Sequence, residues 1–382
     1  VCEFMDYEVP VVNVNTTGKI VGTIEVSEGL SDNLNISGGQ FTEKLDAAWC
    51  VDGFVPGDKN ADGFYAPITT ESAVAMVGDL YYKTLAEAVN AAGADEAVVL
   101  VADVDLDTPF ALNGTVLDLN GKTLTVTNPV FADFSGEVSN LTIKGEIYYT
   151  DADAAGFAVA SSRGYKATKV TNNANVTVMG NAKHIGGFSA RIVNNTELSV
   201  PAECWFIDCV NNGNLYIDST ANEKMRAGGF SGILDLSHFV NCENNGDIYM
   251  KGNICIGAGF VGRVALTASM NGAEAFNCTN NGDVKVEDTY TSKDGVAGAG
   301  TAGADAGGFF GYIGGKNNAG WYKIWGCTNN GNITGSWNNG GIFGLAHDNA
   351  GTVTITGGSI ISSRDGLFVY EGGVTISGGS IS

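Results

Sequence analysis

The sequence predicts an all-β solenoid, in which short strands form coils that stack on one another, and three recurring blocks carry this prediction. A Cys-x-Asn-Asn-Gly block occurs four times, a Gly-Gly-Phe block alternates with it, and a Ser-Gly-Gly block stands near both ends. Strand-like runs of four to six residues separate these corners and leave no room for helices. Each repeat is therefore expected to be one coil with about three strands.

The composition agrees with a folded β protein and argues against several other classes. The chain has 382 residues with a hydrophobic fraction of 44%, which is too apolar for a disordered acidic tail. Its 54 glycines show no three-residue period, so a collagen is excluded. The net charge of −22 repels phosphate, which argues against nucleic acid as a partner. No run of about 18 apolar residues predicts a helix that spans a membrane.

Residues 1–70 are predicted to form a small β-rich module that contains a Ser-Gly-Gly coil at 34–41 and a hairpin. The spacing of Asp58, Asn60 and Asp62 matches the first half of an EF-hand calcium loop. Thr69 occupies the position of the bidentate glutamate, however, and no helices flank the segment. We therefore expect a hairpin turn at the Asp-Gly pair, with the three residues as weak calcium candidates.

Residues 71–382 are predicted to form the solenoid, and its first part carries the one helix that the sequence supports, over residues 84–92. Thr84 and Glu87 have the spacing of a capping box, and Gly93 ends the alanine-rich run. A strand over 97–102 follows, and then two strands about an Asn-Gly turn at 120–121.

Asparagine pairs mark the repeats between about residues 155 and 346. From Asn173 onward, the second members of the pairs are separated by 39, 33, 36 and 49 residues, and they are Asn212, Asn245, Asn281 and Asn330. Between them lie the Gly-Gly-Phe corners and their variants, with Phe188, Phe230, Phe260 and Phe309. Asparagine and glycine suit corners because both tolerate positive φ, and inserted loops explain the uneven steps.

The Ser-Gly-Gly coils return at the end of the sequence, over residues 352–382. Val374 begins a copy of the segment that starts at Val353, at an offset of 21 residues. The same motif occupies residues 34–41, so the chain begins and ends with one kind of coil.

Four of the eight cysteines recur at one position of the repeat, and they are Cys209, Cys242, Cys278 and Cys327. Strand parity groups them with Ile207, Val240, Phe276 and Trp325, so we expect an interior file beside bulky apolar residues. Side chains that point in parallel are poorly placed for disulfides, and buried free cysteine packs as a small hydrophobe. The file is therefore expected to be reduced, with Cys2–Cys50 as the most plausible bridge outside it.

Three parts of the sequence resemble known protein families. The segments TLAEAVNAA, AVVLVADVDL and LDLNGKTLTV resemble the opening of right-handed parallel β-helix proteins of the pectate-lyase-like fold, which implies that the helix at 84–92 caps the solenoid. The alternating Asn-Asn-Gly and Gly-Gly-Phe blocks are similar to the GLUG repeats of bacterial surface proteins. Residues 35–68 resemble a module of large surface proteins from anaerobic gut bacteria. The resemblance implies an architecture, and one that hosts lyases, hydrolases and adhesins alike.

Catalytic candidates exist, but each has a simpler structural explanation. The fold's lyases and hydrolases work with clustered carboxylates, and the sequence offers Asp103, Asp105 and Asp107 in alternation and Asp151 with Asp153. The alternation of Asp103, Asp105 and Asp107 fits the solvent-exposed face of a strand. The three histidines, His184, His238 and His347, have no metal-ligand spacing and are expected at the surface or at corners. Most of the tryptophans, including Trp205, Trp321 and Trp325, are expected in the core, whereas Trp337 is expected at an exposed corner.

The sequence therefore favours a non-catalytic extracellular or cell-surface solenoid that serves as a segment of a fibre, stalk or adhesin. Its expected partners are other copies or adjacent modules stacked end to end, and host or microbial glycans, with loops at 219–225 and 287–306 for recognition. No cofactor is expected. The alternatives are a polysaccharide lyase or glycoside hydrolase, and a non-catalytic glycan-binding module on the same fold.

Overall fold

The computed structural model describes residues 10–93, 96–193, 202–220, 224–265, 272–288, 305–314, 321–335, 338–346, 352–360 and 373–381. It divides into two compact units, Val1–Asp103 with Thr115–Asn120 and Val104–Gly114 with Gly121–Ser382. The predicted boundary at residue 70 lies earlier, because the segments that follow it pack as short antiparallel strands with the helix in the first unit. The prediction of an all-β fold with large parallel sheets and one helix is confirmed for the described residues.

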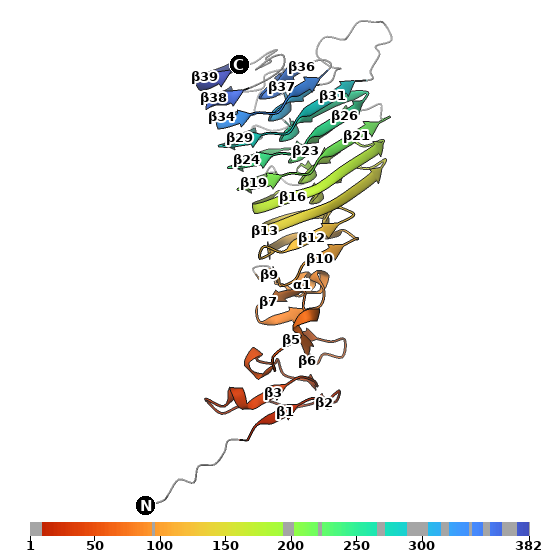
Figure 1. Cartoon of the computed structure of the whole chain (residues 1–382), viewed down its shortest axis with the longest axis vertical. Coiled ribbons are helices and arrows are strands. Elements are labelled where there is room, and N and C mark those ends of the chain that lie inside the picture. The colour runs from red at the N-terminus through yellow and green to blue at the C-terminus, as the bar shows by residue number, and fades with distance from the viewer. Residues whose placement is uncertain are drawn as a thin grey trace, which may run out of the picture. The chain divides into compact units, whose positions relative to one another are not determined.

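The second unit is a β-helix-like stack of coils (Figure 1). A representative coil contains five strands, β19 (Glu203–Ile207), β20 (Val210–Asn211), β21 (Leu215–Ser219), β22 (Lys224–Gly228) and β23 (Ser231–Leu234). Each of them pairs in parallel with its equivalent in the next coil, β24 (Leu236–Val240), β25 (Glu243–Asn244), β26 (Ile248–Gly252), β27 (Ile254–Ala258) and β28 (Val261–Ala265). A coil thus has more strands than the expected three.

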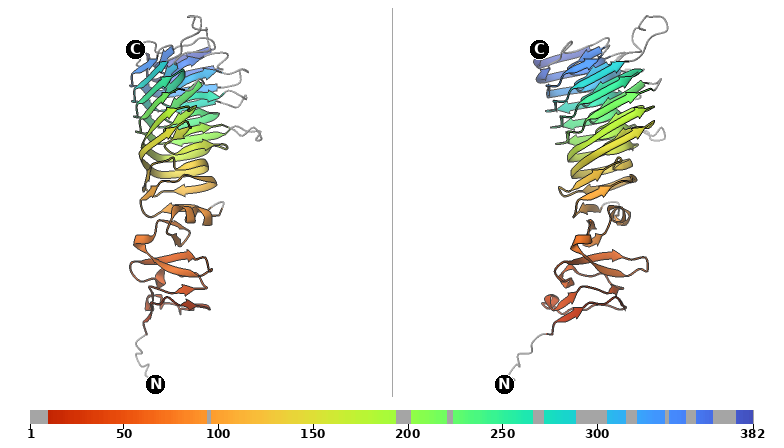
Figure 2. Two further views of the ribbon diagram at one scale, coloured as in Figure 1. Left: turned by 90° about the vertical axis from the view of Figure 1, so that its right-hand side faces the viewer. Right: turned by 45° about the vertical axis from the view of Figure 1, so that its right-hand side comes forward.

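The same pairing continues along the unit in both directions, as the oblique view of the strands shows (Figure 2). The earlier strands are β10 (Val104–Leu106), β11 (Phe110–Asp118, shared with the first unit), β12 (Thr123–Val126), β13 (Phe131–Thr150), β14 (Ala154–Ala155), β15 (Ala158–Ser161), β16 (Tyr165–Gly180), β17 (His184–Gly186) and β18 (Ser189–Ile192). The later ones are β29 (Gly272–Phe276), β30 (Thr279–Asn280), β31 (Val284–Asp288), β32 (Asp305–Gly307), β33 (Phe310–Gly314), β34 (Trp321–Asn329), β35 (Ile333–Gly335), β36 (Asn338–Gly340), β37 (Phe343–Ala346), β38 (Thr352–Ile360) and β39 (Gly373–Ile381).

One bend of the coil depends on a residue with a left-handed backbone. It lies immediately before each repeat cysteine or at the equivalent place, with φ of 53° at Asp208, 53° at Asn241, 51° at Asn277 and 61° at Gly326. Aspartate, asparagine and glycine are the residues that adopt this conformation at least cost. In β16 the same position is Lys169, with φ of 54°.

The Asn-Asn-Gly corner uses its glycine for a different reason from the expected one. Its glycines, Gly213, Gly246, Gly282 and Gly331, do not have positive φ. A Cβ on Gly246 would instead collide with the carbonyl oxygen of Gly213 in the preceding coil. The corner therefore needs glycine because stacked backbones approach each other closely there.

The first unit begins with two stacked coils of its own. β1 (Val12–Val14) pairs in parallel with β3 (Leu34–Ile36), and β2 (Lys19–Ile20) pairs in parallel with β4 (Gln40–Phe41). β5 (Phe54–Lys59) and β6 (Tyr65–Thr69) form an antiparallel hairpin, and so do β7 (Ala75–Val77) and β8 (Leu80–Tyr82). Three short 3-10 turns, η1 (Ser31–Asn33), η2 (Ala47–Trp49) and η3 (Thr70–Ser72), join these elements.

The helix α1 (Leu85–Ala91) lies against β7, β8 and β9 (Ala97–Leu100). Its capping box is present, because Glu87 N donates to Thr84 Oγ1 at 3.1 Å and Thr84 N donates to the Glu87 carboxylate at 3.0 Å. Leu85 and Ala88 form its buried face. In the part of the chain that the structure describes, no helix has the length and hydropathy needed to cross a bilayer.

Candidate functional site

The interior of the second unit holds the repeat phenylalanines as a continuous column. Phe188, Phe230, Phe260 and Phe309 are all 0% exposed. Their rings stack on successive coils with centroids 4.8, 4.8 and 4.7 Å apart. A second column, Phe206 and Phe239, meets them edge-on at 5.4 Å. The spacing of one coil thus gives aromatic contacts both along the stack and across it.

The repeat asparagines form two columns, of which the sequence singled out only the outer one. Asn212, Asn245, Asn281 and Asn330 are exposed, and each Nδ2 donates to Oδ1 of the equivalent asparagine one coil earlier, at 2.8 to 2.9 Å. The residue before each of them lies inside. The inner column consists of Asn172, Asn211, Asn244, Asn280 and Asn329, all 0% exposed.

The inner column satisfies its polar atoms within the core. Asn211 Nδ2 donates to Asn244 Oδ1 at 2.8 Å and to the carbonyl of Gly213 at 3.1 Å, and the pattern repeats on the following coils. The second glycine of each Gly-Gly-Phe corner lies against this column, because a Cβ on Gly229 would overlap Asn244 Oδ1. The two sequence blocks alternate along the chain because they touch across the interior.

The repeat cysteines are buried, but the residues grouped with them by parity are not. Cys209, Cys242, Cys278 and Cys327 are each at most 1% exposed, whereas Phe276 is 42% exposed. Ile207, Val240 and Trp325 are only half-buried. The left-handed residue between the two positions reverses the alternation of side chains, so Phe206 and Phe239 face the core instead.

Each repeat thiol donates to carbonyl oxygens, as Cys242 Sγ does to Phe206 O at 3.2 Å and to Val240 O at 3.4 Å. Burial raises the pKa of Cys242 and of Cys204 well above the ordinary value. The buried cysteines that the structure describes are free thiols. Cys2 lies outside the described residues, so its bridge to Cys50 stays a prediction. Burial, and then Asp46, raises the pKa of Cys50 to about 11.

The calcium candidates lie at the turn of the β5–β6 hairpin. Asn60 Oδ1 accepts hydrogen bonds from the backbone of Asp62 and Phe64, at 3.0 and 3.1 Å. The Asp62 carboxylate pairs with Lys19 at 3.1 Å. These bonds use the oxygens of two candidates for an Asx-type turn and an ion pair. Among the described residues, no three of His, Cys, Asp and Glu gather as metal ligands do.

The catalytic carboxylate candidates do not form a pair poised on a groove. Asp105 is exposed on β10, and Asp103 and Asp107 are exposed on either side of that strand. Asp151 accepts a hydrogen bond from Asn181 N at 2.7 Å. Asp153 accepts from the backbone of Lys183 and His184, at 2.9 Å each. Its pKa is lowered by hydrogen bonds from His184, in spite of burial, which acts in the opposite direction.

Two of the histidines, His184 and His238, form hydrogen bonds with carboxylates instead of lying unpaired at the surface. His238 lies between Glu274, at 2.8 Å, and Glu203, at 3.2 Å, and its ring stacks on Trp205 with centroids 3.9 Å apart. Trp205 and Trp325 thus lie on the outer side of the coil and not in the core. His347, Trp337 and the middle of both predicted recognition loops lie outside the described residues.

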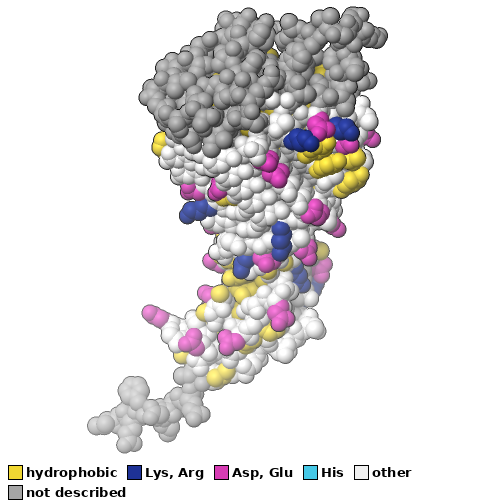
Figure 3. Space-filling view, turned by 45° about the horizontal axis from the view of Figure 1, so that its top comes forward, with side chains coloured by type: hydrophobic (Ala, Val, Ile, Leu, Met, Phe, Trp, Pro, Cys, Tyr) yellow, Lys and Arg dark blue, Asp and Glu magenta, His cyan; other side chains and the backbone are white. Residues whose placement is uncertain are grey.

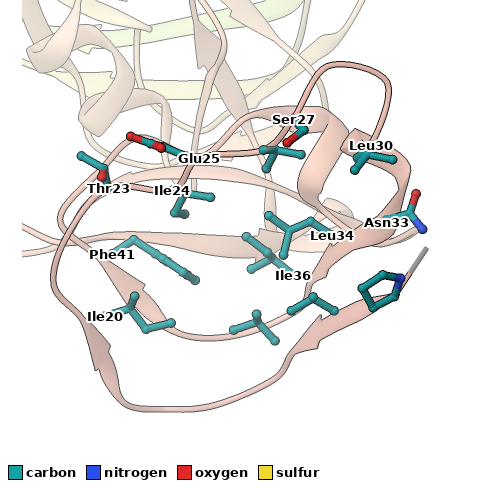
Figure 4. Close-up of a pocket in the computed structure, with 14 residues that line it drawn as sticks. Ile20, Thr23, Ile24, Glu25, Ser27, Leu30, Asn33, Leu34, Ile36 and Phe41 are labelled. Atoms are coloured by element: carbon teal, nitrogen blue, oxygen red, sulfur yellow. The ribbon is translucent and has the colours of Figure 1, made fainter. Parts of the chain in front are cut away.

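An apolar pocket of about 490 Å³ lies within the first coil of the first unit (Figure 4). Val12, Val14 and Ile20 from β1 and β2 line it, with Leu34 and Phe41 of the second coil. Val12 remains 51% exposed. The sequence pattern missed this first coil because Asn-Thr-Thr-Gly stands where the second coil has Ser-Gly-Gly. The signal that could have found it is the alternation Val-Asn-Val, which pairs with Leu-Asn-Ile 22 residues later.

Charged side chains are interspersed in small groups over the described surface that Figure 3 shows, with uncharged surface between them. Lys224 and Arg226 of β22 and Arg263 of β28 are half-buried.

No family model matches the chain, and no curated protein matches it. Among solved structures, one titled "IgA1 Protease" is similar with a TM-score of 0.43 and 16% identity, over 70% of this chain and 21% of that one. The chain thus spans about a fifth of the length of the structure that it matches. The parallel pairing of equivalent strands in successive coils defines the fold of this chain.

Proposed function

We propose that the chain is a non-catalytic, extracellular structural segment of a surface fibre, stalk or adhesin, built as a right-handed parallel β-helix that stacks end to end on a second copy. The observation that carries the proposal is the apolar interior of the first coil, open as a pocket. A coil of a solenoid buries its interior by stacking on the next one, as the coils of β19 and β24 do.

The coil types at the two ends support a second copy as the occupant. β38, which contains Thr-Gly-Gly, and β39, which contains Ser-Gly-Gly, stack in parallel register, with Val353 opposite Val374. β1 and β3 are stacked in the same way, Val12 opposite Leu34. If β39 of one copy stacked on β1 of a second copy, the two strands would pair in parallel, as β38 pairs with β39 and β1 with β3. β1 pairs with β3 on one side among the described residues, so its other edge can accept a strand.

Sedimentation velocity of the full chain over a concentration series tests the stacking. We expect reversible association, weakened about tenfold by Val12→Lys because the charge would be buried in the pocket. Val21→Lys is the matched control, since Val21 is 77% exposed and does not line the pocket. A chain that stays monomeric at every concentration contradicts the stacking, as would equal effects of the two variants.

The absence of catalysis is tested separately. The full chain is incubated with acidic and neutral polysaccharides, and new reducing ends and unsaturated products are measured. We expect neither, because Asp103, Asp105 and Asp107 are exposed, and Asp151 and Asp153 accept hydrogen bonds from neighbouring residues. Turnover of any substrate would instead support the enzyme.

A further inference from the structure

Three tyrosines form a row on the outer side of the second unit. Tyr148 of β13, Tyr216 of β21 and Tyr249 of β26 occupy one register position, and Thr177 of β16 occupies it between the first two. Figure 1 shows these four strands stacked in that order. Tyr148 is 63% exposed and Tyr216 is 45% exposed. The tyrosine row therefore presents large aromatic side chains to solvent, with a gap where the small Thr177 stands.

The ring of Tyr216 is oriented by its neighbour in the next coil. It stacks on Tyr249 with centroids 5.1 Å apart and an angle of 17° between the ring planes. Tyr249 is held in turn, because its hydroxyl donates to Glu287 at 3.1 Å and Lys285 Nζ lies 5.4 Å from its ring centroid. Since one face of Tyr216 covers Tyr249, the opposite face is directed back along the stack toward Thr177. Among the described residues, no ring contacts that opposite face.

The gap at Thr177 has a width that suits one inserted saturated ring. Tyr148 and Tyr216 are two coils apart, so their strands are separated by about 9.6 Å, twice the ordinary strand spacing. A flat aromatic ring between two others needs only about 7–8 Å, which is two contacts of 3.5–4.0 Å. A pyranose chair is thicker than a flat ring, because its carbons are puckered and carry axial groups on both faces. The spacing therefore favours a sugar ring over an aromatic one.

Polar groups flank the gap on the same face of the sheet. Asn175 is two positions before the gap, and its Nδ2 donates to the Glu146 carboxylate at 2.7 Å. Asp218 is half-buried and lies two residues after Tyr216 on β21. Within the part of the chain that the structure describes, no hydrogen bond or ion pair engages the Asp218 carboxylate or the hydroxyls of Tyr148 and Tyr216. Aromatic faces with a few free polar groups beside them are typical of sites for small ligands.

We propose that the gap at Thr177 binds one neutral pyranose ring of a glycan between the rings of Tyr148 and Tyr216. The C–H groups of the sugar pack against the two rings, and the Asp218 carboxylate accepts a hydrogen bond from one of its hydroxyl groups. Glu146 at the edge of the gap and the net charge of −22 disfavour an acidic sugar. The site lies on the side of the solenoid, so it goes beyond the proposed end-to-end stacking and does not depend on it.

Saturation-transfer NMR of the full chain tests the site, with the methyl glycosides of glucose, galactose, mannose and N-acetylglucosamine as probes. We expect at least one of the four to bind saturably, with saturation received at its ring C–H protons. Sodium glucuronate at low ionic strength should bind more weakly than the best glycoside because of its charge, and benzyl alcohol because of its flat ring. Failure of all four glycosides, or tighter binding of either other probe, overturns the proposal.

Filling the gap is the most direct test of its position. Thr177→Tyr should complete the row of stacked rings and weaken the glycoside by about tenfold or more, because the new ring occupies the place of the sugar. It should not lower the melting temperature, since tyrosine is favourable on a half-buried face of a strand. Thr177→Val is the matched control, because it keeps a small β-branched side chain, and it should leave the affinity unchanged. If Thr177→Tyr binds as the parent does, the proposal is wrong.

The aromatic wall is tested at Tyr216. Tyr216→Ala should weaken the glycoside about tenfold, whereas Tyr216→Phe keeps the ring face and should stay within about threefold of the parent. Phe276→Ala is the matched control, because Phe276 is 42% exposed but belongs to β29 and not to the tyrosine row. An alanine at residue 216 that binds as the parent does, or equal losses for the two alanine variants, would contradict the site.

Discussion

The inner and outer asparagine columns contain the same side chain, on the same coils, with almost the same hydrogen-bond lengths. Asn211 and Asn244 are joined at 2.8 Å inside, and Asn212 and Asn245 at 2.9 Å outside. The two columns differ in whether water can replace a lost hydrogen-bond partner of the amide. An outer amide that loses its partner can bond to water, whereas an inner one is left unsatisfied in the core. The comparison separates the presence of a hydrogen bond from its contribution to stability.

The two columns also point in opposite directions. Inner amides donate toward the following coil, and outer amides donate toward the preceding one. The inner column is further confined by the corner glycines, which leave no room beside Asn244 Oδ1. Three pairs of substitutions and one single substitution test how far the columns differ.

The largest difference is expected between Asn244→Asp and Asn245→Asp. Inside, a carboxylate would face Asn280 Oδ1 and the carbonyl of Gly246 without a donor, at a cost of about 3–5 kcal/mol. Outside, the change should stay within about 0.5 kcal/mol. Urea unfolding measures both. Burial raises the folded-state pKa of the inner carboxyl, so the variant should be most stable below about pH 4 and lose stability as the pH rises.

Gly229→Ala should be the next most damaging change, because the new Cβ overlaps Asn244 Oδ1 and the carbonyl of Gly259. Overpacking of this kind costs about 1–3 kcal/mol, and here backbone has to move. Amide hydrogen exchange should rise in that coil first. The control is Gly53→Ala, where a Cβ meets nothing within 4 Å and only the positive φ of 86° is strained. Equal exchange profiles would mean that the corner has space the structure does not show.

Asn244→Ala against Asn245→Ala tests the hydrogen bond alone. The inner change leaves Asn211 Nδ2 and Asn280 Oδ1 without one partner each, at about 2 kcal/mol. The outer change leaves Asn212 Oδ1 and Asn281 Nδ2 open to water and should cost less than about 0.5 kcal/mol. Denaturation midpoints of the two variants give the difference. Identical midpoints would show that water reaches the inner column.

The smallest effect is expected at a third column, at the outer surface. Asp283 N donates to Asp247 Oδ1 at 2.9 Å, so two carboxylates occupy adjacent coils in register. The preceding coil has Asn214 there, which accepts in the same way from Asp247 N at 2.8 Å. Asp247→Asn should therefore keep the hydrogen bond, relieve the repulsion and stabilise the chain by about 0.3 kcal/mol. The gain in melting temperature should disappear at high salt, and a gain that persists would have another cause.

The coil lengths could be predicted from sequence, whereas the inside and outside of a corner could not. The steps counted between asparagines return as the separations of hydrogen-bonded partners, 39, 33, 36 and 49 residues. Parity failed at Phe276, which is exposed, because one left-handed residue at Asn277 shifts the phase of the side chains. A single sequence marks the repeat but not the backbone conformation at each bend.

The candidate sites were less predictable than the core. The first coil was missed because its corner has the sequence Asn-Thr-Thr-Gly in place of Ser-Gly-Gly, although β1 pairs with β3 in regular register. Lys224 and Arg226 lie on one strand, but Arg263 comes 37 residues after Arg226 and on another strand, so only stacking brings its charge near theirs. Local patterns cannot show contacts that depend on how many residues each inserted loop contains.

The asparagine columns have a consequence for how such a chain changes its length. The hydrogen bonds between coils join equivalent residues of neighbouring coils, so a whole coil can be removed or duplicated and both columns will close again. Loss of residues 211–243 would bring Asn244 to the place of Asn211, against Asn172, with no polar atom left without a partner. A loss that is not a whole number of coils would put a different side chain on Asn172. Both columns thus stay hydrogen-bonded only when the chain gains or loses whole repeats.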